Sequence, residues 1–148
     1  MKPVTVSVNV DRPREEVFDF IDRLANHESF MDHMFVDWSF SGPAFGVGAK
    51  ARARVAAPAS REMAEFEVVE SERPARTVEK GVSAHGKRRT SGTYTLSERP
   101  GGGTEIEFEM AWEQAPRSER AVPPLTRAFL KRALGKAMKR LAKELERG

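Results

Sequence analysis

The chain has 148 residues, of which 39% are hydrophobic and 32% charged, and its formal net charge is +3. This length predicts one soluble domain, residues 1–148, large enough to bury a core and still enclose a cavity. The absence of cysteine excludes disulfides, thiolate nucleophiles and cysteine-bound metal, and no apolar run approaches the roughly 18 residues of a membrane span. A strand pattern begins at once, with no apolar leader, so we expect a cytoplasmic protein without stable membrane insertion.

The N-terminal segment alternates valine with polar residues over Val4–Val10, which predicts a strand with one buried face. The sequence Asp11-Arg12-Pro13 ends this strand and introduces a short helix, for which Asp11 is a suitable N-cap. Apolar residues continue at helical spacing as far as Leu24. A second short helix is expected over residues 26–33.

Six further strands follow, separated by Gly- and Pro-containing turns. They are predicted over residues 35–40, 49–56, 62–70, 76–84, 87–97 and 104–113. Short links such as His85-Gly86 are typical of hairpins and favour an antiparallel meander. In the last strand, Phe108 and Met110 share a face opposite Glu107 and Glu109, which indicates a sheet with one covered and one solvated face.

The C-terminal segment, residues 124–146, predicts one long amphipathic helix. Its apolar face consists of residues at helical spacing: Leu130, Ala133, Leu134, Ala137, Met138, Leu141 and Leu145. A single helix cannot bury such a stripe, so it must lie across the sheet. The predicted fold is therefore α+β, with a curved seven-stranded antiparallel sheet, two short helices after the first strand and a long C-terminal helix, and we expect a space between sheet and helix.

The positive charge is concentrated near the C-terminus. Residues 119–148 contain nine Lys and Arg against three Glu. Such a face can attract nucleic acid or anionic lipid, but the simpler interpretation is a solvated outer face whose cations suit the C-terminal half of a helix. We expect no nucleic acid partner, and the sequence does not indicate an oligomeric state.

In residues 8–21 an alternating strand runs into the helix start Pro13-Arg14-Glu15-Glu16-Val17-Phe18, and the segment 26–30 ends in the aromatic Phe30. In these segments the chain resembles the polyketide cyclase/dehydrase and START-like (SRPBCC) superfamily. Residues 8–21 are similar to its opening, in which a strand runs into a Pro-Glu-Glu-Val-aromatic helix start, and residues 26–30 are similar to its second helix, which ends in an aromatic. Gly46-Val47-Gly48, Gly103-Thr104 and residues 134–146 resemble later motifs. The resemblance implies a helix-grip fold with a deep cavity. It also implies binding of lipids, sterols, hormones or polyketides, enzymatic activity in a minority of members, and no universal catalytic residue.

Motifs for metal or nucleotide binding are absent from the sequence. His27 and His33 are six residues apart, which does not place two ligands on one helix face, and His85 belongs to a hairpin tip. The glycines at 101–103 are followed by neither a Lys-Ser/Thr pair nor a helix start. We therefore expect no metal and no cofactor.

For the candidate site, the sequence offers soft and aromatic residues. The predicted ligand-binding residues are Met34, Trp38, Phe45, Phe66, Tyr94, Phe108, Met110, Trp112, Leu130, Leu134 and Met138. The same residue types also serve as plain core. The catalytic candidates are His33 and Tyr94, with Asp37, Lys80 and Arg88 as further titratable groups. Access is expected past residues 41–48 and 115–124.

Three functions follow as hypotheses. The first is non-catalytic binding of a hydrophobic or amphipathic small molecule, such as a lipid or polyketide, between the sheet and the C-terminal helix. The second is a cyclase or dehydrase that acts in the same cavity and needs a titratable group there. The third is an interaction module that uses the basic face of the C-terminal helix.

Overall fold

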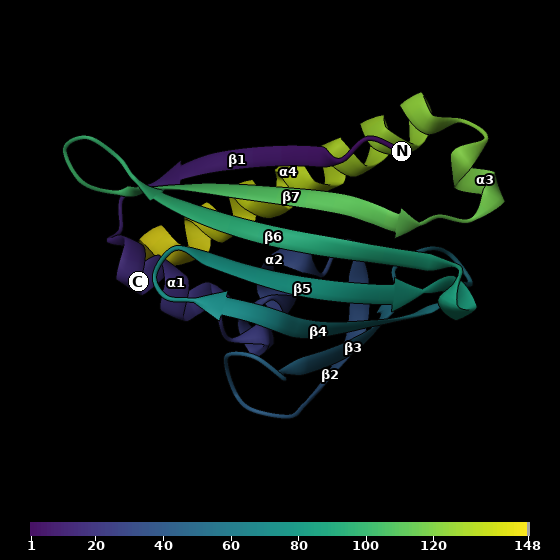
Figure 1. Ribbon diagram of the computed structural model, residues 1–148, viewed down its shortest axis with the longest axis horizontal. Coiled ribbons are helices and arrows are strands. Elements are labelled where there is room, and N and C mark those ends of the chain that lie inside the picture. Colours follow the sequence, from purple (N-terminus) through teal and green to yellow (C-terminus); the bar gives the residue numbers. More distant parts are fainter. Residues whose placement is uncertain (148) are drawn as a thin grey trace.

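The computed structural model describes residues 1–147 and confirms the predicted α+β helix-grip arrangement (Figure 1). The strands, in chain order, are β1 (Val4–Val10), β2 (Phe35–Ser41), β3 (Lys50–Val55), β4 (Met63–Glu72), β5 (Arg76–Ser83), β6 (Arg88–Glu98) and β7 (Thr104–Gln114). The α-helices are α1 (Arg14–Ile21), α2 (Glu28–Met31), α3 (Arg117–Arg120) and α4 (Pro123–Arg147), and the 3-10 helices are η1 (Leu24–Asn26) and η2 (Ala84–Gly86).

The seven strands form one antiparallel sheet in the order β1-β7-β6-β5-β4-β3-β2. Six of them follow one another as a meander, and β1 pairs with β7 so that Val4 lies opposite Met110 and Val10 opposite Thr104. On the outer face of the sheet, Arg52 of β3 approaches Glu65 of β4 to 3.7 Å, which is the cross-strand charge pairing that the alternating pattern favours.

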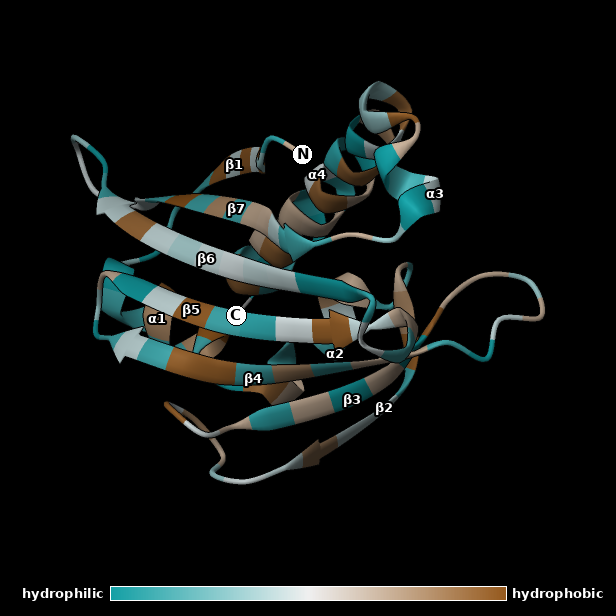
Figure 2. Cartoon of the chain, turned by 45° about the vertical axis from the view of Figure 1, so that its right-hand side comes forward, coloured by the Kyte–Doolittle hydropathy of each residue, from teal (hydrophilic) through white to brown (hydrophobic). Residues whose placement is uncertain are grey.

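Helix α4 crosses the inner face of the sheet diagonally (Figures 1 and 2). The two halves of the helix have different environments. In its C-terminal half, Leu134, Met138 and Leu141 are fully buried in the core, whereas in its N-terminal half Leu125 is 68% exposed and Phe129 73% exposed. The helix therefore packs closely on the sheet along only part of its length.

Two groups of polar contacts, one in each half of the helix, attach α4 to the rest of the protein. Arg140 makes an ion pair of 2.6 Å with Asp32, just after α2. Arg127 donates to the backbone carbonyls of Lys2 and Pro3, at 3.0 and 2.9 Å. Part of the positive charge of this helix thus serves to hold it in place. No helix within residues 1–147 is both long enough and apolar enough to span a membrane.

Some local predictions were wrong. The N-cap of α1 is Pro13, with no side-chain cap, so Asp11 does not have the predicted role. Its backbone N–H instead donates to the carboxylate of Glu146 at 3.1 Å, because the end of α4 lies beside this turn. The connector before α4 contains the short helix α3, which the sequence pattern did not indicate.

Candidate functional site

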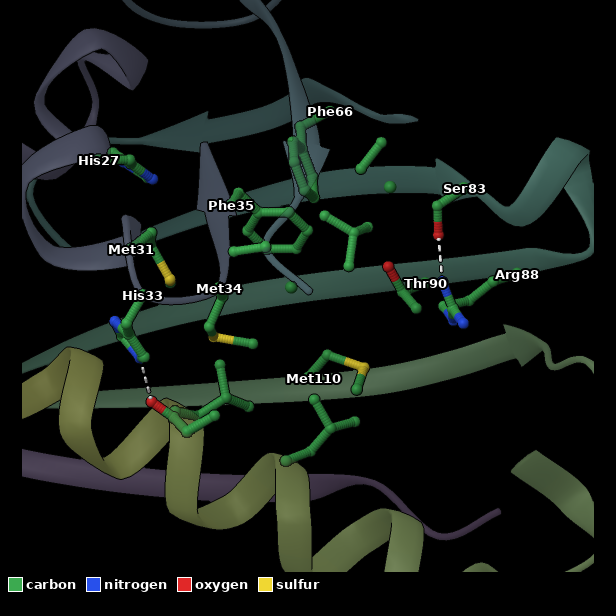
Figure 3. Close-up of a pocket in the computed structure, with 18 of the residues that line it drawn as sticks. His27, Met31, His33, Met34, Phe35, Phe66, Ser83, Arg88, Thr90 and Met110 are labelled. Carbon is green, nitrogen blue, oxygen red and sulfur yellow. Dashed lines mark hydrogen bonds between the residues drawn. The ribbon is translucent and has the colours of Figure 1, made fainter. Parts of the chain in front are cut away.

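A cavity of about 900 Å³ lies between the inner face of the sheet and the N-terminal half of α4 (Figure 3). Its walls come from strands β2 to β7, from the segment between α2 and β2, and from α3 and α4. Because Leu125 and Phe129 line this cavity and are largely exposed, the cavity reaches the surface beside α3. It therefore occupies the place where the helix stands away from the sheet.

One wall of the cavity is an aromatic cluster. The rings of Phe35 and Phe66 meet edge to face at 5.2 Å, and the Trp38 ring is stacked on Phe66 at 6.2 Å. Phe35 and Trp38 would lie on opposite faces of a regular strand. A register shift between Val36 and Ser39, with Asp37 at φ 56°, brings both rings to the cavity.

Most of the predicted ligand-binding residues lie on this cavity wall. They are Met34, Trp38, Phe66, Phe108, Met110, Trp112, Leu130 and Leu134. Whether they contact a ligand stays a prediction. Phe35 and Thr90 also line the cavity, and the sequence pattern did not single them out.

Three residues of the predicted set lie elsewhere. Phe45 is 59% exposed on the loop between β2 and β3, where its ring lies below the Arg23 guanidinium at 5.5 Å. Tyr94 and Met138 are both 1% exposed and belong to the packed core, not to the cavity wall. An apolar residue type predicts burial, but it does not distinguish a filled core from the wall of a cavity.

Access was predicted past two loops, and the cavity reaches only one of them. Glu119 of the 115–124 segment lies on its rim, together with Ala56 and Ala57 of the β3–β4 connection. No residue of the 41–48 loop lines it. Part of that loop, with Arg23 and Leu24, borders a separate small hollow of about 150 Å³.

The histidines on the cavity wall are both engaged with the protein. His33 Nε2 lies 2.8 Å from the Ala133 carbonyl, to which it donates, so its Nδ1 accepts from Arg140 at 3.1 Å (Figure 3). His27 Nε2 donates to the Ile21 carbonyl at 2.7 Å, and burial lowers the pKa of His27 to about 4. His33 therefore has no free ring nitrogen for the general acid or base role that the sequence suggested.

The other predicted titratable groups are divided between the cavity and the surface. Lys80 points outward and pairs with Glu113 at 2.7 Å, so the idea of an inward Lys80 was wrong. Asp37 is exposed and bonds to Arg54 at 2.8 Å. Tyr94 has a buried hydroxyl with no hydrogen-bond partner within residues 1–147, and burial, followed by the charge of Glu79, raises its pKa well above the ordinary value. Arg88 does line the cavity.

Arg88 is the centre of a polar cluster on the rim. Its guanidinium donates to Glu62 at 2.8 Å, to Ser83 Oγ at 2.8 Å and to the carboxylate of Glu119. The hydrogen bond to Glu119 is the largest cause of the raised pKa of Arg88. These contacts join β6 to the start of β4 and to α3, so they hold α3 against the sheet beside the opening.

Glu79 is the functional group that the sequence pattern missed. It lies on β5, the central strand of the sheet, opposite Val68 of β4 and Gly92 of β6, and its side chain faces the cavity. It makes no hydrogen bond or ion pair with the residues that the structure describes, and burial raises the pKa of its carboxyl to about 7. The signal in the sequence was weak, because Glu79 alternates with Val78, whose type suggested the buried face.

Metal-ligating side chains do not gather at this site. Within residues 1–147 no group of three His, Cys, Asp or Glu side chains could hold a metal ion. What the cavity offers is a large apolar surface, one unpaired carboxyl and an ion-paired rim.

Comparison with known proteins identifies the family. The family model described as "Polyketide cyclase / dehydrase and lipid transport" matches residues 1–146, so the chain belongs to this family. The resemblance noted in the sequence is thus confirmed. No curated protein matches the chain.

Solved structures share the fold at low sequence identity. TTHA0849 from Thermus thermophilus superposes with a TM-score of 0.75 at 16% identity, over 97% of each chain. MLL2253 from Mesorhizobium loti gives a TM-score of 0.72 at 19% identity, over 99% of this chain and 98% of the other. DynU16, a putative protein in the dynemicin biosynthetic locus, gives 0.68 at 20% identity, and the match covers 99% of this chain but only 48% of DynU16.

Proposed function

We propose that the protein binds a hydrophobic or amphipathic small molecule in the cavity between the sheet and α4. The observation that carries the proposal is the apolar space of about 900 Å³ under the N-terminal half of that helix. Ligand pockets in proteins commonly have volumes of roughly 300–1,000 Å³ and mostly apolar walls. Binding would remove apolar surface of both ligand and wall from water, which is the driving force for such an interaction.

The family supports this assignment at the level of class. Its description combines polyketide cyclases and dehydrases with lipid transport, and both activities require an apolar organic molecule to enter the fold. The aromatic wall of Phe35, Trp38 and Phe66 would accept either a flat ring system or an acyl chain.

Two measurements test the binding function. Mass spectrometry of the purified protein under non-denaturing conditions should detect a co-purified small molecule. Titration with the neutral dye N-phenyl-1-naphthylamine should give saturable fluorescence, because this dye emits strongly in apolar surroundings. Leu130→Trp fills the cavity from α4 and should weaken dye binding by at least about tenfold, since the added ring occupies the ligand's space.

The matched control is Lys131→Trp. This residue is the next one on α4 but is exposed and does not line the cavity, so its substitution should leave dye affinity within about twofold. Equal affinity in the wild-type protein and the Leu130→Trp variant, with no bound molecule detected, would contradict the proposal.

A second candidate is a cyclase- or dehydrase-type enzyme, and Glu79 is the observation that favours it. Aldol cyclisation and dehydration both require proton removal from a carbon beside a carbonyl. A carboxyl whose pKa is about 7 is suited to that task near neutral pH, and Glu79 faces the cavity.

Solvent exchange at carbon tests this candidate without knowledge of the natural substrate. In D₂O, the protein should accelerate deuterium incorporation beside the carbonyl of 4-phenylbutan-2-one, as followed by NMR. Glu79→Gln should abolish the acceleration, because an amide is not a base. Equal exchange rates with the two proteins would contradict a catalytic role for Glu79.

A further inference from the structure

Among the acidic residues on the cavity wall, Glu79 differs from the other two. Glu62 and Glu119 also line the cavity, but both are neutralised by the guanidinium of Arg88. The carboxyl of Glu79 has no such partner within residues 1–147, although Glu79 is half-buried on the central strand and lines the cavity. A buried carboxylate without a hydrogen-bond donor is costly, so an unpaired one in a cavity requires explanation.

No donor within residues 1–147 is hydrogen-bonded to Glu79. Lys80 points outward to Glu113, and the Arg88 guanidinium is taken up by Glu62, Ser83 and Glu119. Tyr94 comes close enough for the charge of Glu79 to influence its phenol, but its hydroxyl is not hydrogen-bonded to any group of residues 1–147. A bound molecule that carries a polar hydrogen would supply a donor for this carboxyl.

We infer that Glu79 recognises the polar end of the ligand, and that this ligand is an apolar molecule that carries a protonated amine. The inference rests on the proposed binding function and names the chemical class of its ligand. A cation would satisfy Glu79 by a charge-assisted hydrogen bond, which is roughly twice as strong as a neutral one. An anionic ligand would instead bring a second negative charge beside an already desolvated carboxyl, which is unfavourable.

The position of Glu79 is consistent with this arrangement. Gly92 lies opposite it on β6, and the space that a Gly92 side chain would take is occupied by the Phe108 ring and the stem of Glu79, which faces the cavity. The apolar body of the ligand would then lie along the aromatic wall of Phe35, Trp38 and Phe66, under Leu130 of α4. The cavity thus provides one polar anchor within an apolar container.

Three compounds of matched shape test the inference: 2-naphthylmethylamine, 2-naphthylmethanol and 2-naphthoate. They carry a cation, a neutral hydroxyl and an anion on the same ring system. Binding to the wild-type protein at about pH 8, measured by displacement of N-phenyl-1-naphthylamine, should be at least about tenfold tighter for the amine than for the alcohol, and weakest for the acid.

The Glu79→Gln variant should bring the affinities for the amine and the alcohol to within about threefold, because the amide carries no charge. Glu109→Gln is the matched control. Glu109 is exposed on β7, on the outer face of the sheet, so the preference for the amine should persist in that variant. Circular dichroism of each variant verifies that it is folded.

The pH dependence provides a readout that needs no substitution. Affinity of the wild-type protein for the amine should fall about tenfold between pH 8 and pH 6, as Glu79 gains a proton, while affinity for the alcohol should not change. Other ionisable groups lie near Glu79 or line the cavity: Tyr94, His27, His33, Glu62, Arg88, Glu119, Arg132 and Lys136. The same titration of Glu79→Gln separates their contribution from that of Glu79.

The results distinguish failure of the inference from failure of the binding function. If the wild-type protein binds the three compounds equally, prefers the acid, or keeps its preference for the amine in Glu79→Gln, the ligand class is wrong and the binding function stands. If neither the dye nor any of the compounds binds, both proposals are overturned.

Discussion

Glu79 and Gly92 face each other across strands β5 and β6, and a Cβ atom at Gly92 would lie 3.3 Å from the Cγ of Glu79. The same Cβ would lie 2.9 Å from two ring carbons of Phe108. The absence of a side chain at Gly92 therefore leaves no empty space there. It is filled by the Phe108 ring and by the stem of the carboxyl that faces the cavity.

The substitution Gly92→Ala should destabilise the protein. A Cβ atom so close to the Phe108 ring forces the ring or the backbone to shift, and overpacking of this kind typically costs about 1–3 kcal/mol. Urea denaturation measures this loss directly as a fall in the free energy of unfolding. A change smaller than about 0.5 kcal/mol would show that the ring and Glu79 can rearrange without cost.

Gly135→Ala is the contrasting substitution. Gly135 lies in the middle of α4, and a Cβ there would meet no atom within 4 Å, so the methyl group introduces no clash. Alanine is favoured over glycine in a helix interior, and we expect stability to rise by roughly 0.5–1 kcal/mol. The measurement is the same urea denaturation. A loss of stability would mean that the glycine serves a contact with a molecule outside this chain.

Glu79→Gln should change how stability depends on pH. The folded state raises the pKa of Glu79 from 4.5 to about 7. Between these values the folded protein holds more protons than the unfolded chain, so Glu79 makes the free energy of unfolding fall as pH rises, and this loss is complete above about pH 7. The variant lacks this loss, so its stability relative to wild type should increase across that window by on the order of 3 kcal/mol.

The pH dependence of wild-type stability alone would not reveal the contribution of Glu79, because His27 contributes in the opposite direction. Burial lowers the pKa of His27 from 6.5 to about 4, so between these values the unfolded chain holds more protons and His27 makes stability rise with pH. The two residues act in opposite directions, and only the difference between variant and wild type isolates Glu79. Glu109→Gln on the outer face serves as the control. A difference between Glu79→Gln and wild type that stays constant over pH 4–8 would contradict the prediction.

Tyr94→Phe should leave the fold intact and stabilise it slightly. The Tyr94 hydroxyl is buried and has no hydrogen-bond partner in the described part of the chain, while its ring packs on Phe108 at 4.5 Å and on His27 at 5.7 Å. Phenylalanine keeps both ring contacts and removes the unsatisfied group, which should gain up to about 1 kcal/mol. Thermal unfolding provides the measurement. A loss of more than about 1 kcal/mol would show that the hydroxyl is bonded to an internal water.

The layout of the fold was predictable because its signals are periodic. Alternation at Val4–Val10 and at Ile106–Trp112 gave two strands that pair with each other, and the helical spacing of Leu134, Met138 and Leu141 gave the face that packs on the sheet. These patterns arise because apolar residues are buried, and residue type predicts burial well. The resemblance to the family then predicted how these strands and helices are arranged in one fold.

The cavity residues were predictable only in part. Phe35 reaches the cavity through an irregularity in β2 that strict alternation does not contain, and Glu79 lies beside Val78, which the pattern favours as the inward residue. Tyr94 and Met138 have the residue types of a cavity wall and belong to the core instead. An apolar residue lines the cavity only where α4 lies away from the sheet. The position of α4 is a property of the tertiary structure, so the local sequence pattern does not predict it.

Arg88 holds α3 beside the opening of the cavity, and its removal should loosen this end of the protein. Arg88→Met would leave the carboxylates of Glu62 and Glu119 near each other without a cation. Their side chains are 29% and 20% exposed, so solvent screens the repulsion only in part, and we expect a loss of about 1–3 kcal/mol.

The local effect of Arg88→Met should exceed the global one. Amide hydrogen exchange in residues 117–130 should quicken more than exchange in β6 and β7, because Arg88 is the side chain that ties α3 to the sheet, and bound dye should dissociate faster through the loosened rim. Arg120→Met, an exposed cation on the same short helix, should change neither quantity. Unchanged exchange in residues 117–130 of Arg88→Met would mean that α3 is held by its backbone contacts with α4 and not by this cluster.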